Sequence, residues 1–548
     1  MQNSHSQQLK VALIVPAKKF RCLGGILWTQ RYGPLQVATV VHEAGHFVQV
    51  YNEEIGNKVY PQEIALNYDV VGISSKTSAI TRAEEIAQQI KIAAKQFNRN
   101  IIMVLGGEHA SMSNGNRISS DFDYVLPGES ELAFLDILEF IKLERQGMQK
   151  TFNIIPPKGF YQCETFNNIP DISLVVGYED VIHGWLFRHL PLIWSIKHKR
   201  LPTICFQGTR GCPYNCSFCP TPTYLQGRKY RRRDNESAIK YLKEHISKSG
   251  IKRVMFEDPT SAIPFDEESY RFFQSIANSS IEMKATVLVR PDLCQDEKLL
   301  EVMKAAGVSN LSIGIESLND KTLKDFKKKT SLNILERSIE VFHNKGFSVT
   351  GLFIAGYDTE DMGSFIANKK FIIDTGIEKW RVSPLGQMPE VPDQFLPTHR
   401  AFLWNELDDF GSDLADYMNG EFVIFFPKNM KPSILQKKIE EFNYSSSSWA
   451  GTIKLFLKHK RLGPVFQRAG NNIAQKMIQR EVVKSNYIQM LDELEQPFYD
   501  RHGRNWILRE DLLVERYKER LSVTSPNAND YEIPWKNYFF KESILGKI

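Results

Sequence analysis

The sequence predicts an α/β protein built from three main parts. Residues 1–140 are expected to form a Rossmann-like, doubly wound parallel sheet, and residues 201–392 a partial (β/α)6 barrel of the TIM type, followed by a mainly helical extension over 393–548. Two observations carry this prediction. Short, continuously apolar runs alternate with helical patterns in the first two parts, which is typical of parallel strands buried on both faces. The last part shows helical spacing instead, and 548 residues exceed the size of a single core.

The first part is predicted to hold five strands, at residues 11–15, 46–51, 68–74, 101–105 and 122–126, with helices at 34–44 and 79–97. Ligands of such sheets bind above the carboxyl ends of the strands. Small residues there let a flat ligand approach the backbone, and hydroxyl groups can donate hydrogen bonds to it. The candidate ligand-binding residues at these strand ends are Ser74, Ser75, Thr77, Gly106, Gly107, Glu108, Gly128 and Glu129.

Residues 141–200 show no sustained periodicity and are interpreted as a linker between domains. This stretch includes Pro156 and Pro157 and ends in a basic run at 197–200, which we interpret as a solvated face. Its aromatic residues Trp185, Phe187 and Trp194 are expected to pack against one of the neighbouring domains.

The central part is predicted to hold six strands, at residues 203–206, 253–256, 286–289, 309–315, 348–355 and 379–382. Helices are expected at 235–249 and 297–306. Polar residues or glycines follow several of these strands, and a barrel of this kind carries its active site at the carboxyl ends of the strands. The candidate site residues at these ends are Glu257, Asp258, Arg290, Glu316, Ser317 and Gly356.

The C-terminal part is expected to form helices at 404–418, 433–442, 453–459 and 472–489, with a turn-rich patch at 500–504. It contains no cysteine, so we expect no additional metal cluster there.

The chemistry centres on the loop after the first barrel strand, where Cys212, Cys216 and Cys219 follow one another with the spacing C-x3-C-x2-C. Thiolates bind iron in iron–sulfur clusters, and a [4Fe–4S] cube usually takes four of them. Three ligands without an obvious fourth predict a cube with one iron open to another molecule. A zinc site would need a fourth Cys or His, and Cys205 is the only thiol nearby. Chance clustering of buried cysteines is the third interpretation.

Composition narrows the classes of protein. A net charge of +5 over this length argues against an obligate nucleic-acid binder. Seven cysteines, three of them in one motif, predict reduced thiols and a cytoplasmic location. Residues 1–10 lack the apolar core of a signal peptide, and no run approaches the ~20 apolar residues of a membrane span.

The cysteine motif, its place after the first barrel strand and the polar strand ends resemble the radical S-adenosylmethionine (SAM) enzymes. In that family the three cysteines hold a [4Fe–4S] cluster whose open iron is chelated by SAM, and one electron splits SAM into methionine and a 5′-deoxyadenosyl radical. The resemblance implies that Cys212, Cys216 and Cys219 are the metal ligands and the catalytic residues. Phe218 matches the position whose backbone approaches adenine, and it equally suits a hydrophobic plug over the cluster.

The same resemblance implies roles in SAM binding for the residues at the barrel strand ends. Glu257 or Asp258 matches the group that binds the ammonium of SAM by a charge-assisted hydrogen bond. Arg290 matches a frequent active-site arginine. Segment 312–317, with Glu316 and Ser317, resembles a signature that contacts ribose and methionine, and Gly356 matches the glycine beneath adenine.

The first part, with its GPL and EAGH segments, resembles the cobalamin-binding domain that precedes the barrel in one subclass of this family. The sequence has no D-x-H-x-x-G motif, so the resemblance implies a cobalt without a protein histidine, or no cobalamin at all. The alternative is a degenerate Rossmann-like domain that only covers the active site. If cobalamin is retained, the glycine, serine and acidic strand ends of the first part are its predicted contacts.

The basic run at 228–233 has several possible uses. It could bind RNA phosphates, the carboxylate of SAM or the phosphate of cobalamin, or it could be solvated. No second basic patch with interleaved aromatic residues accompanies it, so we favour a small-molecule contact or a solvated face.

Taken together, the resemblance implies a cobalamin-dependent radical SAM methyltransferase of the class B type that acts on an unactivated carbon of a small-molecule, lipid or natural-product substrate. An electron donor such as a flavodoxin or ferredoxin is the expected protein partner, and no nucleic-acid partner is expected. One alternative is a radical SAM cyclase or rearrangement enzyme without methyl transfer. Another is a non-catalytic corrinoid-binding or metal-binding protein. RNA modification would require salt-sensitive RNA binding.

Overall fold

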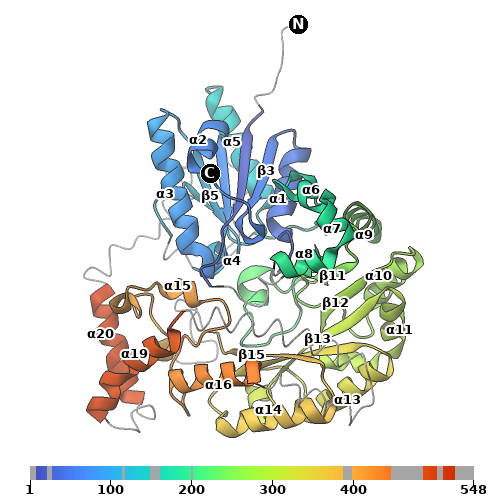
Figure 1. Ribbon diagram of the computed structural model, residues 1–548, viewed down its shortest axis with the longest axis vertical. Helices are drawn as coiled ribbons and strands as arrows, with labels where there is room; N and C mark the ends of the chain where they lie inside the picture. Colours follow the sequence, from blue (N-terminus) through green and yellow to red (C-terminus); the bar gives the residue numbers. More distant parts are fainter. Residues whose placement is uncertain are drawn as a thin grey trace, which may run out of the picture.

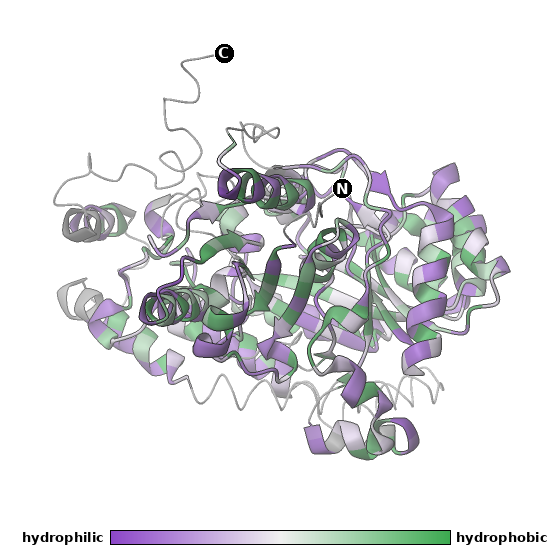
Figure 2. Cartoon of the chain, turned by 90° about the horizontal axis from the view of Figure 1, so that it is seen from above, coloured by the Kyte–Doolittle hydropathy of each residue, from purple (hydrophilic) through white to green (hydrophobic). Residues whose placement is uncertain are grey.

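The computed structural model describes residues 8–20, 27–113, 118–148, 161–198, 201–386, 398–445, 485–502 and 510–524. These residues form two parallel sheets covered by helices, with a group of C-terminal helices beside the second sheet (Figure 1). Hydrophobic residues concentrate on the central strands, whereas the surrounding helices alternate between hydrophobic and hydrophilic faces (Figure 2). The predicted α/β class is confirmed. Among the described helices, none is long and apolar enough to cross a bilayer.

The N-terminal sheet has five parallel strands in the order β3-β1-β4-β5-β6. Their bounds are β1 (Lys10–Val15), β3 (Phe47–Asn52), β4 (Val70–Ser74), β5 (Ile102–Gly106) and β6 (Tyr124–Val125). The strand order changes direction next to β1, so a topological switch point lies between the carboxyl ends of β1 and β4.

Helices cover both faces of this sheet, which explains why most residues of its central strands are buried and apolar. One core holds α1 (Tyr32–Glu43) and α5 (Glu131–Arg145), and the other holds α2 (Pro61–Asn67) and α3 (Ile80–Gln96). Residues of β1 alternate between the two cores. The short helix α4 (Glu108–Met112) follows β5.

The described part of the predicted linker is folded. It contains η4 (Ile172–Leu174), α6 (Tyr178–His183), α7 (Trp185–His189) and α8 (Pro191–His198). Trp28 of β2 (Leu27–Trp28) stacks on Tyr178 at 4.7 Å between ring centroids and contacts Trp194 at 5.3 Å. Phe187 completes this aromatic group, whereas Trp185 is 67% exposed, contrary to the predicted packing. Residues 156–157 and 199–200 lie outside the described part.

The second sheet has six parallel strands in the order β15-β14-β13-β12-β11-β8. β8 and β15 are therefore its two edges, and the barrel is partial, as predicted. The strands are β8 (Ile204–Phe206), β11 (Arg253–Phe256), β12 (Lys284–Val289), β13 (Val308–Glu316), β14 (Ser348–Ala355) and β15 (Lys379–Pro384). The connecting helices are α9 (Asn235–Ser249), α10 (Glu267–Asn278), η6 (Pro291–Gln295), α11 (Glu297–Ala305), α12 (Asp320–Asp325), α13 (Leu332–Asn344) and α14 (Met362–Thr375).

Short elements join the two halves. A hairpin of β9 (Thr209–Arg210) and β10 (Arg231–Arg232) brackets the cysteine loop, with η5 (Thr221–Leu225) inside it. The strand β7 (Leu201–Pro202) pairs in parallel with β2 of the N-terminal half. Every strand predicted in both halves has its counterpart, with ends shifted by at most two residues.

The C-terminal part contains η7 (Thr398–Arg400), η8 (Asp408–Phe410), α15 (Leu414–Tyr417), α16 (Pro432–Ser445), α19 (Tyr487–His502) and α20 (Glu510–Thr524). The predicted helix 433–442 is confirmed as α16. The helix predicted at 404–418 is wrong except for its last turn, and α19 continues into the patch predicted as a turn at 500–504. Residues 453–459 lie outside the described part, as does 472–484 of the last predicted helix.

Helix α16 also finishes the edge of the barrel. The side chain of Asn443 accepts a hydrogen bond from the backbone N of Val382 at 3.0 Å and donates one to its carbonyl oxygen at 2.8 Å. The carboxamide thereby takes the place that a neighbouring strand would occupy beside β15.

Candidate active site

The three cysteines lie on the loop between β9 and β10, and each is half-buried. Gly211 begins the loop with φ +77°, and a Cβ there would collide with the carbonyl oxygen of Lys229. The amide of Cys212 donates to the carbonyl of Gly227 at 3.0 Å, and the amide of Ser217 donates to that of Phe326 at 3.0 Å. The loop is therefore held by both the hairpin and the segment after β13.

The surroundings of the thiols are electropositive on one side. Burial raises the pKa of Cys212 and Cys216, and neighbouring thiols raise it further. Arg290 lowers the pKa of both, and Lys328 lowers that of Cys216. Cations at this position favour the thiolate form that binds metal. No three His, Cys, Asp or Glu side chains of the described residues are arranged to hold a single metal ion; the ligands of an iron–sulfur cube each bind a different iron.

Predicted SAM-binding residues surround this loop. Arg290, directly after β12, lies 4.0 Å from the ring centroid of Tyr214 in the loop and donates to the carbonyl of Lys328 at 2.7 Å. Glu316 ends β13 with φ +62° and forms a buried ion pair with Lys328 at 2.7 Å. Phe218 packs on Phe326 at 5.0 Å between ring centroids. The structure thus brings Arg290, Glu316 and Phe218 to one side of the loop, together with Lys328.

Ser317 and Gly356 meet at a second buried carboxylate, that of Glu360. The hydroxyl of Ser317 donates to Glu360 Oε1 at 2.9 Å, and the amide of Gly356 donates to Oε2 at 3.0 Å. Burial raises the pKa of Glu360 to about 7. Glu360 was not among the predicted site residues; it lies just before α14, which begins at Met362, and it joins the ends of β13 and β14.

Glu257 and Asp258 are adjacent in sequence but differ in surroundings. Asp258 is 5% exposed and accepts hydrogen bonds from the amides of Gly208 at 2.8 Å and Thr209 at 2.9 Å. Burial raises its pKa to about 6. Glu257 is less buried and lies close enough to Cys205 to raise the pKa of that thiol. Asp258 therefore supports the backbone that leads into the cysteine loop, and Glu257 is the more accessible carboxylate.

A cavity of about 270 Å³ lies at the switch point of the N-terminal sheet. Six of the predicted contacts line it: Ser74, Gly106, Gly107, Glu108, Gly128 and Glu129. Ser75 and Thr77 are buried behind this surface instead. A Cβ at Gly107 would come within 2.7 Å of the carbonyl oxygen of Ser75, so the glycine is required for the backbone to pass there.

The chemistry of the cavity suits a flat macrocycle. Glycine and serine form much of its surface on the sheet side, and Leu13, Val37 and Phe134 provide apolar contacts. Among the described residues no histidine lines it, and His109 is buried with Nδ1 3.2 Å from the Thr77 hydroxyl. A cobalamin in this cavity would therefore bind without a histidine from the described lining.

The opposite wall of the cavity comes from the barrel half, through Gln207, Arg210, Leu225 and Gln226. Arg210 directly precedes the cysteine loop. The cavity and the loop therefore share a wall, and the carboxyl ends of both sheets face the same region of the molecule (Figure 1).

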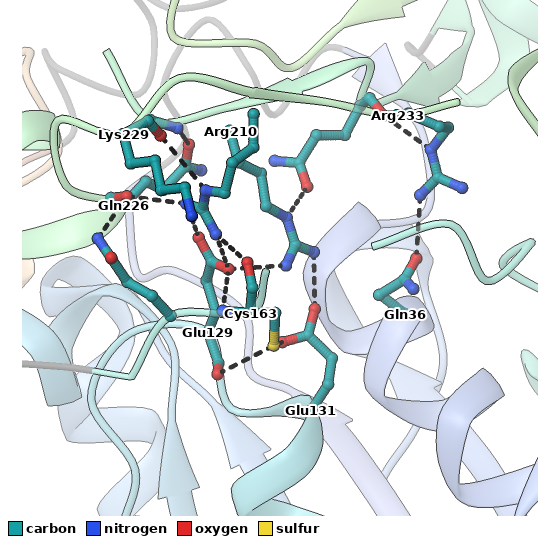
Figure 3. A network of polar contacts seen from close by, with 12 residues as sticks. Gln36, Glu129, Glu131, Cys163, Arg210, Gln226, Lys229 and Arg233 are labelled. Atoms are coloured by element: carbon teal, nitrogen blue, oxygen red, sulfur yellow. Dashed lines mark hydrogen bonds and ion pairs between the residues drawn. The ribbon is translucent and has the colours of Figure 1, made fainter. Parts of the chain in front are cut away.

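A buried ion network joins the two halves beside the cavity (Figure 3). Glu129 pairs with Arg231 at 2.6 Å and with Arg210 at 3.2 Å, and Arg210 also pairs with Glu131 at 2.6 Å. All four side chains are at most 8% exposed. The amide of Cys163 donates to Glu129 at 2.8 Å. The two acids come from the N-terminal half and the two arginines from the hairpin around the cysteine loop.

This network corrects the interpretation of the basic run 228–233. The extended backbone of β10 sends alternate side chains to opposite sides. Arg231 enters the ion network, and Arg233 bonds to Tyr32 and Gln36 of α1, so both are buried between the halves. Arg232, between them in the strand, instead donates a hydrogen bond to the hydroxyl of Ser269 in α10 at 2.8 Å. Neither buried arginine is solvated or free for a small-molecule phosphate.

Two family models match the chain. One is described as the radical SAM superfamily and matches residues 206–372, and the other is a B12-binding domain and matches residues 29–138. The first range holds the cysteine loop and the strand ends around it. The second holds strands β3 to β6 and most of the sheet side of the cavity.

Individual proteins are also similar to this chain. The chain is 26% identical to bacteriochlorophyllide d C-12(1)-methyltransferase of Chlorobaculum tepidum, over 69% of this chain and 76% of that protein. It is 23% identical to the anaerobic magnesium-protoporphyrin IX monomethyl ester cyclase of Rubrivivax gelatinosus, over 57% of this chain and 56% of the cyclase, a little over half its length. A solved structure of the radical SAM methyltransferase TsrM from Kitasatospora setae, with cobalamin and a [4Fe–4S] cluster bound, shares the fold, with a TM-score of 0.53 at 16% identity over 70% of this chain and 74% of TsrM.

Proposed function

The chain is a radical SAM protein with a B12-binding domain, and from this we propose that it is a cobalamin-dependent methyltransferase that acts on an unactivated carbon. One observation carries the proposal: the cysteine loop and the cavity at the switch point share a wall, formed by Gln207, Arg210 and their neighbours. A donor bound in the cavity and a radical generated at the loop would thus act on a substrate held between them.

Cys212, Cys216 and Cys219 would hold a [4Fe–4S] cluster, and the cavity would hold cobalamin. When bound, the cluster and SAM supply the 5′-deoxyadenosyl radical that removes a hydrogen atom, and cobalamin supplies the methyl group. The residues of the chain bind and orient these groups and exclude water.

Charge around the loop supports a site for the amino-acid part of SAM. Arg290 and Lys328 place two cations beside Cys216, where a carboxylate would be attracted. Glu316 is paired with Lys328, and Glu257 is the more accessible acid at the end of β11. We assign the ammonium of SAM to Glu257 rather than to Asp258, because the carboxylate of Asp258 is already bonded to two backbone amides.

The proposed substrate is a small molecule, a lipid or another natural product. One relative is named for methyl transfer to a bacteriochlorophyllide and another for cyclisation of a porphyrin ester. The second name favours one alternative for this chain, a radical SAM cyclase or rearrangement enzyme without methyl transfer. A flavodoxin-like or ferredoxin-like electron donor is the proposed protein partner.

The test is anaerobic purification with assays of iron, sulfide and cobalamin, followed by reaction under a strong reductant with SAM labelled in its methyl group. The proposal expects 5′-deoxyadenosine together with labelled methyl in a product. 5′-Deoxyadenosine without transferred label would favour the cyclase or rearrangement alternative. Cobalamin binding without any 5′-deoxyadenosine would favour a non-catalytic corrinoid protein.

A further inference from the structure

Two carboxamide side chains on the barrel wall of the cavity are held in a fixed orientation. Arg210 Nε donates to Gln207 Oε1 at 2.8 Å, and the amide of Gly211 donates to Gln226 Oε1 at 3.1 Å. A guanidinium N–H and a backbone N–H can only donate, so the atom that faces each of them must be the carbonyl oxygen. The NH2 group of each carboxamide must therefore point away from its donor.

These two NH2 groups have no acceptor within the part of the chain that the structure describes. Neither Nε2 atom forms a hydrogen bond to a described residue. Neither belongs to the fully buried polar atoms that lack a partner, so both remain accessible. Gln207 is 8% exposed, and both residues line the cavity. Because both NH2 groups remain accessible and both residues line the cavity, a ligand or a water molecule there can supply the acceptor atoms that the chain does not.

The donors that orient the two carboxamides belong to the start of the cysteine loop. Arg210 and Gly211 immediately precede Cys212 in the chain. The guanidinium of Arg210 is fixed in turn by Glu129 and Glu131 of the N-terminal half (Figure 3). A ligand that bonds to Gln207 or Gln226 is thus one side chain away from the backbone that carries the first cysteine.

We propose that Gln207 and Gln226 are cobalamin-binding residues, whose NH2 groups donate to carbonyl oxygens of the carboxamide side chains on the rim of the corrin. Through Arg210 and Gly211 the same two residues position the cysteine loop, so that filling of the cavity is transmitted to the cluster. This inference rests on the proposed function, because it assumes that the cavity holds cobalamin.

The discriminating substitution is Gln→Glu. In Q207E one carboxylate oxygen keeps the bond to Arg210, while the atom facing the cavity changes from a donor to an acceptor. The same reasoning applies to Q226E and the amide of Gly211. Q207M tests the loss of the donor without an added charge. Gln274 of α10 lies outside the cavity and bonds to Asn278, so Q274E is the matched control for added charge.

The experiment measures binding of hydroxocobalamin to the cluster-loaded protein by its visible absorption, and the electron paramagnetic resonance spectrum of the reduced cluster with and without the corrinoid. We expect wild type and Q274E to bind alike, and Q207E and Q226E to bind at least about tenfold more weakly each, which is about the loss of one hydrogen bond to a buried group. The corrinoid should change the cluster spectrum of wild type and leave that of the Q207E/Q226E double variant unchanged.

The possible outcomes distinguish a failure of cobalamin binding from a failure of the two proposed glutamine contacts. If wild type does not bind hydroxocobalamin, the cobalamin part of the proposed function fails, and this inference fails with it. If wild type binds and Q207E, Q226E and Q207M bind within twofold of it, the proposed function survives and the NH2 groups bond only to water. Iron content and melting temperature of each variant show that weaker binding does not reflect loss of the cluster or of the fold.

Discussion

Asp258 shows how the surroundings of one carboxylate decide its role. Its Oδ1 atom accepts two backbone hydrogen bonds, from Gly208 and Thr209, and Oδ2 has no hydrogen-bond partner among the described atoms. Burial outweighs the two amides and raises its pKa from 3.8 to about 6. The folded chain therefore retains this proton to a higher pH than the unfolded chain does.

The pKa of Asp258 predicts how stability depends on pH. Because the folded state favours the neutral form, the free energy of unfolding should fall as pH rises from about 4 to about 6 and then level off. The two-unit shift corresponds to about 3 kcal/mol. D258N keeps an oxygen for both amides and cannot ionise, so it should lose this component of the pH dependence. Melting temperatures of wild type and D258N between about pH 4 and about pH 6 test this prediction. The same pH dependence in both proteins would show that Asp258 does not have a raised pKa in the folded state.

The cysteine ligands are tested by a matched pair of single substitutions. C216A should lose the iron, the sulfide and the broad visible absorbance of the cluster after anaerobic reconstitution, because no other thiol of the described loop can replace Cys216. C294A removes a buried thiol outside the loop and should retain all three. A C216A protein that keeps a full complement of iron would show that the ligand assignment is wrong.

At the residue scale, the sequence predicted the cysteine loop and most strand-end residues around it, because spacing and strand ends are local properties. It could not separate Glu257 from Asp258, since the bonds that distinguish Asp258 come from Gly208 and Thr209, which lie 50 and 49 residues earlier in the chain. It also missed Lys328 and Glu360. Their partners, Glu316 and Ser317, lie 12 and 43 residues away in sequence. The only local signal for Lys328 was the lysine run that contains it.

At the scale of elements, the start of the cysteine loop depends on a glycine. Gly211 has φ +77°, and an added Cβ would collide with the backbone of Lys229. Gly250 has a similar φ of +69° at the end of α9, but its Cβ would meet nothing within 4 Å. The two positions share the conformational demand and differ in the space available.

We therefore expect a glycine-to-alanine substitution to have different effects at Gly250 and at Gly211. G250A should destabilise the protein by about 1 kcal/mol, from the left-handed conformation alone. G211A adds a backbone collision, so the β9–β10 hairpin must shift and cluster loading should fall. Thermal melting and iron content after reconstitution measure the two effects. Equal melting temperatures and equal iron content in both variants would contradict the required close approach at Gly211.

The strands were predictable because their central residues are buried, so most of them contain a short run of mainly apolar residues. The elements of 161–198 were not, because helices of five to eight residues are too short to show a period. Their order comes from packing on Trp28, which lies far away in sequence. The helix predicted at 404–418 failed for a related reason: most of this stretch packs as irregular chain around Phe402 and Leu407.

At the scale of the whole molecule, the ion network fixes the two halves against each other. Removal of one partner from a buried pair leaves an uncompensated charge, which typically costs about 3 to 5 kcal/mol. We therefore expect R231A to lower the melting temperature strongly and to expose the junction to proteolysis. Arg271 and Glu267 form an exposed pair on α10, and R271A should cost less than about 1 kcal/mol.

A double-mutant cycle separates the pair from the general effect of truncation. E129Q combined with R231A should be less harmful than the sum of the two single changes, since each already disrupts the same contacts. Strict additivity would indicate that Glu129 and Arg231 stabilise the junction independently, contrary to the bidentate contact between them. The sequence could not predict this network, because its acids and arginines are about 80 to 100 residues apart.

The side chain of Asn443 has a consequence for behaviour in concentrated solution. An open barrel ends in a strand whose free amide and carbonyl groups can recruit a strand from another copy. At Val382 the amide and the carbonyl are both bonded to the carboxamide of Asn443, so they cannot pair with a strand of another copy. Val382 and Asn443 are both fully buried where α16 packs along β15, so replacement of Asn443 by leucine would leave the amide and the carbonyl of Val382 buried without partners and would loosen the cover over the last strand of the barrel.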